Sequence, residues 1–225
     1  MALTDLAPVS RLSTAEIIAD QLRTAIMKGV LEPGTQLGEA ELAAHFQVSR
    51  GPLREAMQRL VSEGLLRSIR NRGIFVTELT LDDVVDVYRS RSVIERGALE
   101  MILDDERREA AYVALEPAVV AMQAAAERGD AAAVSDADQL FHQILVECSD
   151  SPRLVRASRT LLIETRMCMG ALQTTYDDIR EQAQEHAELR EAIRSGSVSD
   201  VHALLAHHLD DAVQRLRKEQ QTLSS

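Results

Sequence analysis

The fold of this chain is decided by residues 37–76, which read LGEAELAAHFQVSRGPLREAMQRLVSEGLLRSIRNRGIFV. Residues 38–46 have the apolar spacing of a short amphipathic helix. A two-residue gap separates them from Ser49, a residue type that favours the N-cap of a further helix. Gly64 is a typical residue at a helix end. The stretch therefore predicts two consecutive helices joined by a tight turn.

The second of these helices carries different chemistry on its two faces. Leu53, Met57 and Leu60 are spaced so that they bury one face. Arg50 and Arg54 lie one turn apart on another face. The sequence therefore predicts a helix that packs on one side and carries arginines on the other.

Elements on either side complete a small domain. A capping box at residues 13–16 begins a supporting helix that ends at Gly29. Residues 65–70 and 74–77 predict two strands, and residues 71–73 predict a hairpin turn with a basic tip. Three helices followed by a hairpin are the layout of a winged helix-turn-helix, whose recognition helix enters the major groove of DNA.

The distribution of charge also indicates contact with DNA at one end of the chain. The net charge of −11 by itself disfavours binding to a polyanion. Residues 1–78, however, carry nine basic and nine acidic side chains, while the remaining residues carry 16 basic and 27 acidic ones. Between Arg50 and Arg72, six arginines oppose two glutamates. The sequence therefore predicts a basic DNA-reading region on an acidic body.

Length and composition indicate the number of domains and the class of protein. With 225 residues, 45% of them hydrophobic, the chain is predicted to form two domains, residues 1–78 and 79–225. No run approaches the roughly 18 apolar residues of a membrane helix. The first residues lack a signal-peptide pattern, so a cytoplasmic protein without a membrane partner is expected. Cys148 and Cys168 are too few for a disulfide framework and predict reduced thiols.

Several motifs of the first domain occur at a specific spacing: Leu42-Ala43, Val48-Ser49-Arg50-Gly51-Pro52-Leu53-Arg54-Glu55-Ala56, Arg59-Leu60, Glu63-Gly64-Leu65 and Gly73-Ile74-Phe75-Val76. Together they resemble the DNA-binding signature of the GntR family of bacterial transcription regulators. The resemblance implies that Arg50 and Arg54 contact DNA, and that the wing tip enters the minor groove. The predicted DNA-binding residues are Ser49, Arg50, Arg54, Arg59, Arg72 and Gly73.

The second domain is predicted to be entirely helical. Capping and turn residues divide it into six helices at about 81–103, 106–127, 131–148, 152–175, 177–194 and 198–219. The short turns between them predict a six-helix antiparallel bundle. The predicted fold class is therefore mainly α, with three helices and a small β-hairpin at the N-terminus followed by this bundle.

Polar residues interrupt the inward apolar stripes of three bundle helices. Asp138 and His142 lie one turn apart in the third helix, His186 lies in the fifth and His208 in the sixth. Burying four such groups without compensation costs several kcal/mol, and one divalent cation compensates all of them. Nitrogen-rich ligation suits Zn²⁺ first, and also Ni²⁺, Fe²⁺ or Mn²⁺. The alternative is that each histidine is a hydrogen-bonded core residue.

The same positions form longer motifs: Asp138-x-x-Phe141-His142, Glu185-His186-x-x-Leu189-x-x-Ala192-Ile193 and His208-Leu209. They resemble the ligand pattern of the FCD effector domain of the FadR subfamily of GntR regulators, and the six-helix length is more like its VanR-type branch. The resemblance implies that Asp138, His142, His186 and His208 coordinate a divalent ion. It also implies that a small organic acid binds at the open positions of that ion.

Two arginines are candidates for holding the carboxylate of such an effector. Arg91 lies at the inward phase of the first bundle helix, where a guanidinium could bind a carboxylate through two hydrogen bonds. Arg166 in the fourth helix is the second candidate. The alternative for Arg91 is a helix pair with Glu95 one turn later.

We therefore predict a homodimeric transcription regulator that binds a palindromic DNA operator and responds to a small organic acid. Two copies are expected because one winged module contacts too few base edges for useful selectivity. Repression is the expected sign by resemblance to the family. Two alternatives stay open: a sensor for which the metal ion is itself the signal, and a metalloenzyme that activates water.

Overall fold

A computed structural model of the chain describes residues 13–103, 105–173 and 178–223. Its contacts divide the chain into two units, with the boundary between Glu78 and Leu79. The predicted helix end at residue 175 and the predicted helix start at residue 177 lie outside the described residues.

From residue 13 onward, where the structure describes it, the first unit contains three helices: α1 (Thr14–Met27), α2 (Glu39–Phe46) and α3 (Arg50–Ser62). The backbone N–H of Glu16 donates to the Ser13 side chain at 3.2 Å, which forms the predicted capping box of α1. The apolar residues Leu53, Met57 and Leu60 of α3 are buried, and α3 packs against α1. Burial of this stripe leaves the opposite side of α3 exposed to solvent.

Ser49 stands at the N-cap position of α3 with extended backbone, as predicted, but its side chain makes no capping hydrogen bond. The predicted N-cap position of Ser49 is therefore confirmed, although its hydroxyl does not cap a backbone N–H. Ser49 is exposed to solvent.

A small antiparallel sheet completes the first unit. It contains β1 (Gln36–Leu37), β2 (Leu66–Ile69) and β3 (Gly73–Val76), in the order β1-β3-β2. The predicted hairpin corresponds to β2 and β3, paired from Leu66 opposite Val76 to Ile69 opposite Gly73. β1 was not predicted, because two residues are too short to show the alternation of a strand. Its pairing with β3 joins the wing to the segment that leads into α2.

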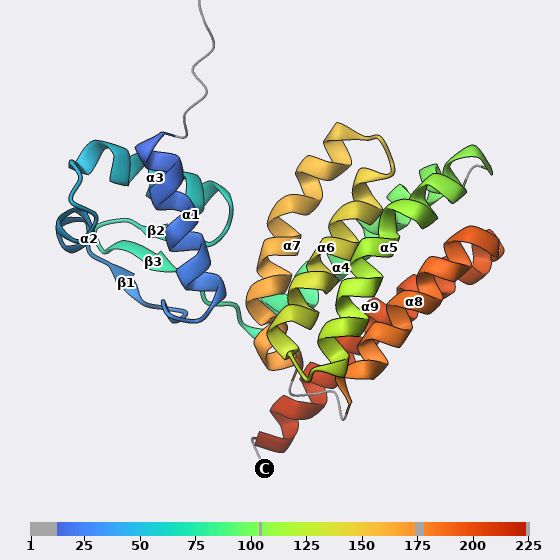
Figure 1. Ribbon diagram of the computed structural model, residues 1–225. Coiled ribbons are helices and arrows are strands. Elements are labelled where there is room, and N and C mark those ends of the chain that lie inside the picture. The colour runs from blue at the N-terminus through green and yellow to red at the C-terminus, as the bar shows by residue number, and fades with distance from the viewer. Residues whose placement is uncertain (1–12, 104, 174–177, 224–225) are drawn as a thin grey trace, which may run out of the picture. The chain divides into compact units, whose positions relative to one another are not determined.

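The second unit contains six helices among the described residues: α4 (Leu81–Ile102), α5 (Asp105–Glu127), α6 (Ala131–Glu147), α7 (Pro152–Gln173), α8 (Ile179–Ser195) and α9 (Val198–Leu223). In the bundle, α6 packs against both α5 and α7 (Figure 1), α8 packs against α5, and α4 packs against α7 and α9. The fold class predicted from the sequence is confirmed. None of these helices is long and apolar enough to cross a membrane, in the part of the chain that the structure describes.

The interior of the bundle is mainly apolar. Its core is formed by side chains that are at most 2% exposed and come from five helices, including Leu99, Ile102, Leu115, Met122, Phe141, Leu145, Leu189, Ile193 and Leu205. Their burial stabilises the folded state by about 25 cal/mol per Å² of apolar surface removed from water. The buried polar residues Arg91, Glu95, Asp138, His142, Gln182 and His186 interrupt this core. The candidate functional site is therefore inside the bundle and not on its surface.

Candidate metal centre and DNA-binding surface

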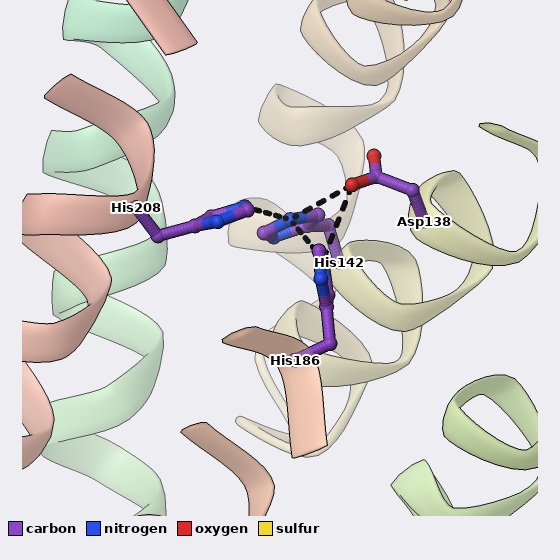
Figure 2. Close-up of side chains that lie close together, drawn as sticks. All are labelled: Asp138, His142, His186 and His208. Carbon is purple, nitrogen blue, oxygen red and sulfur yellow. Dashed lines mark hydrogen bonds and ion pairs between the residues drawn. The ribbon is translucent and has the colours of Figure 1, made fainter. Parts of the chain in front are cut away.

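Four side chains from three helices of the bundle point toward one another (Figure 2). Asp138 and His142 lie one turn apart on α6, His186 lies on α8, and His208 lies on α9. One potential ligand atom of each lies within 4.8 Å of those of the others. His142 and His186 are at most 1% exposed, and the side chain of His208 is 11% exposed. The cluster is therefore reached by solvent mainly beside α9.

The distances within this cluster fit ligation of one ion. The Nε2 atom of His142 is 3.3 Å from Nε2 of His208 and 3.4 Å from Nε2 of His186. The Oδ1 atom of Asp138 is 3.1 Å from Nε2 of His186 and 3.9 Å from Nε2 of His142. Atoms bound at about 2.1 Å to a common metal ion are about 3.0 Å apart in adjacent octahedral positions and about 3.4 Å apart in a tetrahedron. Three of these four distances therefore match the spacing of ligands to a shared cation, and the distance from Asp138 to His142 is longer.

The second nitrogen of each imidazole is held by an oxygen atom outside the cluster. Nδ1 of His142 lies 2.7 Å from Oε2 of Glu95, and Nδ1 of His208 lies 2.9 Å from Oε2 of Glu185. Nδ1 of His186 lies 2.7 Å from the main-chain oxygen one turn earlier on α8. Because carbonyl and carboxylate oxygens accept, each Nδ1 carries a hydrogen, and Nε2 of His142 and of His208 directs its lone pair into the cluster. Nε2 of His186 faces Oδ1 of Asp138. Lone pairs that converge in this way repel one another unless a cation lies between them.

The electrostatics of the cluster favour the neutral imidazole, which a metal ion requires, at two of the three histidines. Burial lowers the pKa of His142 to about 4. Burial and the nearby His186 lower the pKa of His208. Burial opposes the charge of His186 as well, but the hydrogen bond to Asp138 raises its pKa above the ordinary value. The cluster thus offers two neutral imidazoles and a third that can exchange its proton for a metal ion.

The carboxylate of the cluster stays ionised. Burial opposes the charge of Asp138, but the hydrogen bond with His186 and the field of His142 hold the pKa of Asp138 well below its usual range. The amide Nε of Gln182 also donates to Oδ1 of Asp138, at 3.0 Å. Asp138 therefore supplies one negative charge. A divalent ion bound to it would carry more positive charge than this carboxylate neutralises.

Arg91 is buried next to this cluster and is only 2% exposed. Its Nε donates to Oε1 of Glu95 at 2.7 Å, and its Nη1 donates to Oγ1 of Thr165 at 3.3 Å. The helix pair considered as the alternative for Arg91 is therefore present. Its Nη2 atom, however, is buried and has no hydrogen-bond partner among the described residues. A buried guanidinium N–H of this kind is a place where an anionic ligand can bind.

Arg166, the second effector candidate, has a different partner. Its Nη2 lies 2.8 Å from Oδ1 of Asp136, whose side chain is 69% exposed, so this ion pair lies at the edge of the bundle. Nε of Arg166 also donates to Oδ1 of Asp136, at 2.8 Å. Its role in effector binding stays a prediction.

The sequence did not reveal the network that supports His208. Glu185 accepts from His208 through Oε2, and its Oε1 lies 3.0 Å from Nη2 of Arg215. Arg215 also forms an ion pair with Asp211 one turn earlier on α9. The Asp211–Arg215 spacing is visible in the sequence, but the contact with α8 depends on how the two helices are offset.

The predicted DNA-binding residues of α3 are exposed to solvent. Arg50 is exposed at the start of the helix. The side chain of Arg54 is 61% exposed, and its Nε donates to Oε2 of Glu39 on α2 at 2.7 Å. The side chain of Arg59 is 41% exposed and lies 3.5 Å from Glu16 on α1. All three guanidinium groups are therefore accessible, but only Arg50 and Arg54 share one side of α3. Arg59, five residues after Arg54, lies about 140° further round the helix and faces α1.

The tip of the wing is held in a defined conformation. Gly73 has φ +110° and Asn71 has φ +63°, values that glycine and asparagine adopt more readily than other residues. Nε2 of Gln36 donates to the main-chain oxygen of Arg72 at 2.7 Å, and the Arg72 guanidinium lies 5.8 Å from the centre of the Phe75 ring. β1 thus fixes the tip that carries Arg72 and Gly73.

Comparison with known families agrees with this division of the chain. The family described as bacterial regulatory proteins, gntR family, matches residues 14–76, and the FCD domain matches residues 86–211. The FCD match alone covers more than half of the 225 residues. The chain belongs to the GntR family. As a GntR-family protein with an FCD domain, it is a DNA-binding transcription regulator and not an enzyme.

Individual relatives of this GntR-family regulator are moderately similar. The gluconate operon transcriptional repressor of Bacillus licheniformis is 30% identical over 83% of this chain and 78% of its own length. The HTH-type regulator YdhC of Bacillus subtilis is 34% identical, over 60% of each chain. A crystal structure of a GntR transcriptional regulator from Rhodococcus sp. RHA1 is 27% identical, with a TM-score of 0.78 over 92% of this chain and 99% of that one.

Proposed function

We propose that this regulator acts as a homodimer whose affinity for a palindromic operator is controlled by a small organic acid bound at a metal ion in the FCD domain. Asp138, His142, His186 and His208 would hold the ion, with Zn²⁺ as the first candidate and Ni²⁺, Fe²⁺ or Mn²⁺ as further ones. The observation that carries the proposal is the convergence of their four ligand atoms within 4.8 Å in the bundle core.

The electrostatics of the site favour an anionic effector. Once the three imidazoles bind the ion in their neutral form, only Asp138 among the four proposed ligands is charged, so a divalent ion there keeps a net positive charge. Arg91 adds a buried guanidinium whose Nη2 has no partner among the described residues. A carboxylate could bind the ion through one oxygen and Arg91 through another, which would satisfy both.

The relatives narrow the class of acid to be tested first. One relative is named a gluconate operon repressor, so sugar acids are the first class and short hydroxy acids the second. By the same relationship we propose repression as the sign of regulation. The acid would then release the operator, and DNA binding would in turn weaken the binding of the acid.

On the DNA side, α3 would enter the major groove and the wing the minor groove. Arg50 and Arg54 would contact base edges or phosphates, with Ser49 and Arg59 beside them and Arg72 and Gly73 at the wing tip. The exposed side of α3 and the Gln36–Arg72 hydrogen bond at 2.7 Å support this placement. Two copies related by a two-fold axis would read a palindromic site.

DNA binding measured in four conditions tests this proposal. Fluorescence anisotropy of a labelled operator, obtained by selection with the full chain, would be recorded with metal-loaded and chelator-treated protein, each with and without the acid panel. We expect one acid to weaken binding by about 10-fold, and only with metal present. An equal response after metal removal would contradict the proposal. DNA affinity that follows metal concentration without any acid would instead support the ion-sensor alternative.

A further inference from the structure

The guanidinium of Arg54 is already held by a carboxylate in the absence of DNA. Nε of Arg54 on α3 donates to Oε2 of Glu39 on α2 at 2.7 Å. The Arg54 side chain remains 61% exposed, whereas that of Glu39 is 33% exposed. For Arg50, by contrast, no ion pair within 4.0 Å is found in the described part of the chain. Of the two arginines of α3 that are predicted to contact DNA, Arg54 is therefore oriented by an ion pair within the domain and Arg50 is not.

The geometry of a guanidinium determines which N–H groups of Arg54 can still bind a base while Nε is bound to Glu39. Arginine has five N–H groups in a planar fork, and the Nε–H group points to the side of the fork. When Nε is bound to Glu39, the two terminal amino groups remain directed outward. These groups can donate side by side to O6 and N7 of guanine, the commonest specific contact in the major groove. The ion pair thus leaves the guanine-reading end of Arg54 accessible.

We propose that Glu39 is a positioning residue that makes Arg54 selective for a guanine in the operator. This proposal rests on the proposed contact between Arg54 and DNA. Glu39 restricts the guanidinium to one orientation, so less conformational freedom is lost when the correct base is met. A guanidinium without this restraint could turn toward a neighbouring phosphate, which carries no sequence information.

The negative charge of Glu39 also favours selectivity for the operator over unrelated DNA. A carboxylate beside the major groove repels phosphates and lowers affinity for any sequence. Only a base that engages both terminal amino groups of Arg54 offsets this repulsion. Glu39 therefore lowers binding to unrelated DNA more than binding to the operator, and it acts on the ratio of the two affinities.

The test compares Glu39→Ala with Glu41→Ala in the full chain. Glu41 is a matched control because it is an exposed acidic residue in the same first turn of α2. Binding to the selected operator, to operators with each G·C pair changed to A·T, and to an unrelated duplex would be measured by fluorescence anisotropy. Circular dichroism would check folding, and Glu39→Gln, which keeps an uncharged acceptor for Nε, gives a second and milder variant.

For Glu39→Ala we expect discrimination at one G·C pair to fall by about 10-fold. Glu39→Gln should give a smaller loss at the same pair. Glu41→Ala should keep wild-type discrimination, while both alanine variants bind the unrelated duplex more tightly. Wild-type discrimination in Glu39→Ala, or an equal loss in Glu41→Ala, would overturn the positioning role. Arg54→Ala separates the two proposals: if it leaves both the affinity and every base preference unchanged, the contact between Arg54 and DNA is refuted as well.

Discussion

Glu95 bridges the guanidinium of Arg91 and the imidazole of His142. Oε1 of Glu95 accepts from Nε of Arg91, and Oε2 accepts from Nδ1 of His142, both at 2.7 Å. Burial opposes the charge of Glu95, but Arg91 and His142 lower its pKa to about 2. An ionised Glu95 therefore fixes the tautomer of His142 and connects the proposed effector arginine to the proposed metal ligand.

Glu95→Gln should weaken metal binding. The amide is uncharged and can present an N–H to Nδ1 of His142, so the tautomer that directs a lone pair into the cluster is no longer enforced. Loss of such a supporting carboxylate typically lowers metal affinity by about 10- to 100-fold. Competition of the chelator-treated protein with a zinc-binding dye would measure this change. Glu100→Gln, an exposed change on the same helix, should bind metal like the wild type.

Removal of the metal should lower the thermal stability of the FCD domain. The ion would offset repulsion among three converging imidazole nitrogens, and a ligand present at 1,000 times its Kd stabilises the folded state by about 4 kcal/mol. We expect a lower melting temperature in chelator, and restoration by a stoichiometric amount of Zn²⁺. The variant His186→Ala with Asp138→Ala should not respond to either treatment. A wild-type melting curve that is unchanged by chelator and by Zn²⁺ would contradict the proposed site.

Helical periodicity explains why the four residues of the cluster could be found in the sequence. Asp138, His142, His186 and His208 each interrupt an otherwise apolar stripe, and the phase of that stripe predicts which side of a helix is buried. The structure brings their ligand atoms within 4.8 Å of one another. The division into helices was also predictable, because capping and turn residues mark the ends of helices.

Contacts between helices were not predictable in the same way. Periodicity does not set the offset of one helix against its neighbour, which decides that Glu185 meets His208 and that Glu95 meets His142. The pairing of Arg54 with Glu39 depends likewise on how α2 crosses α3. For Arg166, the partner Asp136 lies on another helix, 30 positions away.

Acid should destabilise the metal-free protein partly through Glu95. Because the folded pKa of about 2 lies below the ordinary value of 4.5, Glu95 stabilises the folded state above pH 4.5, and this contribution is lost as the pH falls toward 2. Glu95→Gln lacks this titration. Urea unfolding of the chelator-treated proteins at pH 5.5 and at about pH 4 should therefore show a smaller loss of stability in the variant. An equal loss in both proteins would contradict an ionised Glu95 in the core.

Arg50→Ala should weaken DNA binding without changing base preference strongly. Arg50 is exposed at the start of α3, and a phosphate contact there contributes about one unit to the slope of log affinity against log salt. We expect lower affinity for operator and unrelated duplex alike, and a shallower salt dependence. Arg89→Ala removes an exposed arginine of α4 and serves as the charge-matched control. An affinity and salt slope equal to those of the wild type would remove Arg50 from the proposed contacts.

The metal content of the purified protein tests the central claim most directly. Elemental analysis would compare the wild type with the double variant His186→Ala and His208→Ala, and with His207→Ala, which removes the exposed histidine next to His208. The account predicts a stoichiometric divalent ion in the wild type and in His207→Ala, and none in the double variant. A double variant that retains the full metal content, or a wild type that binds no divalent ion when Zn²⁺ is supplied, would contradict it.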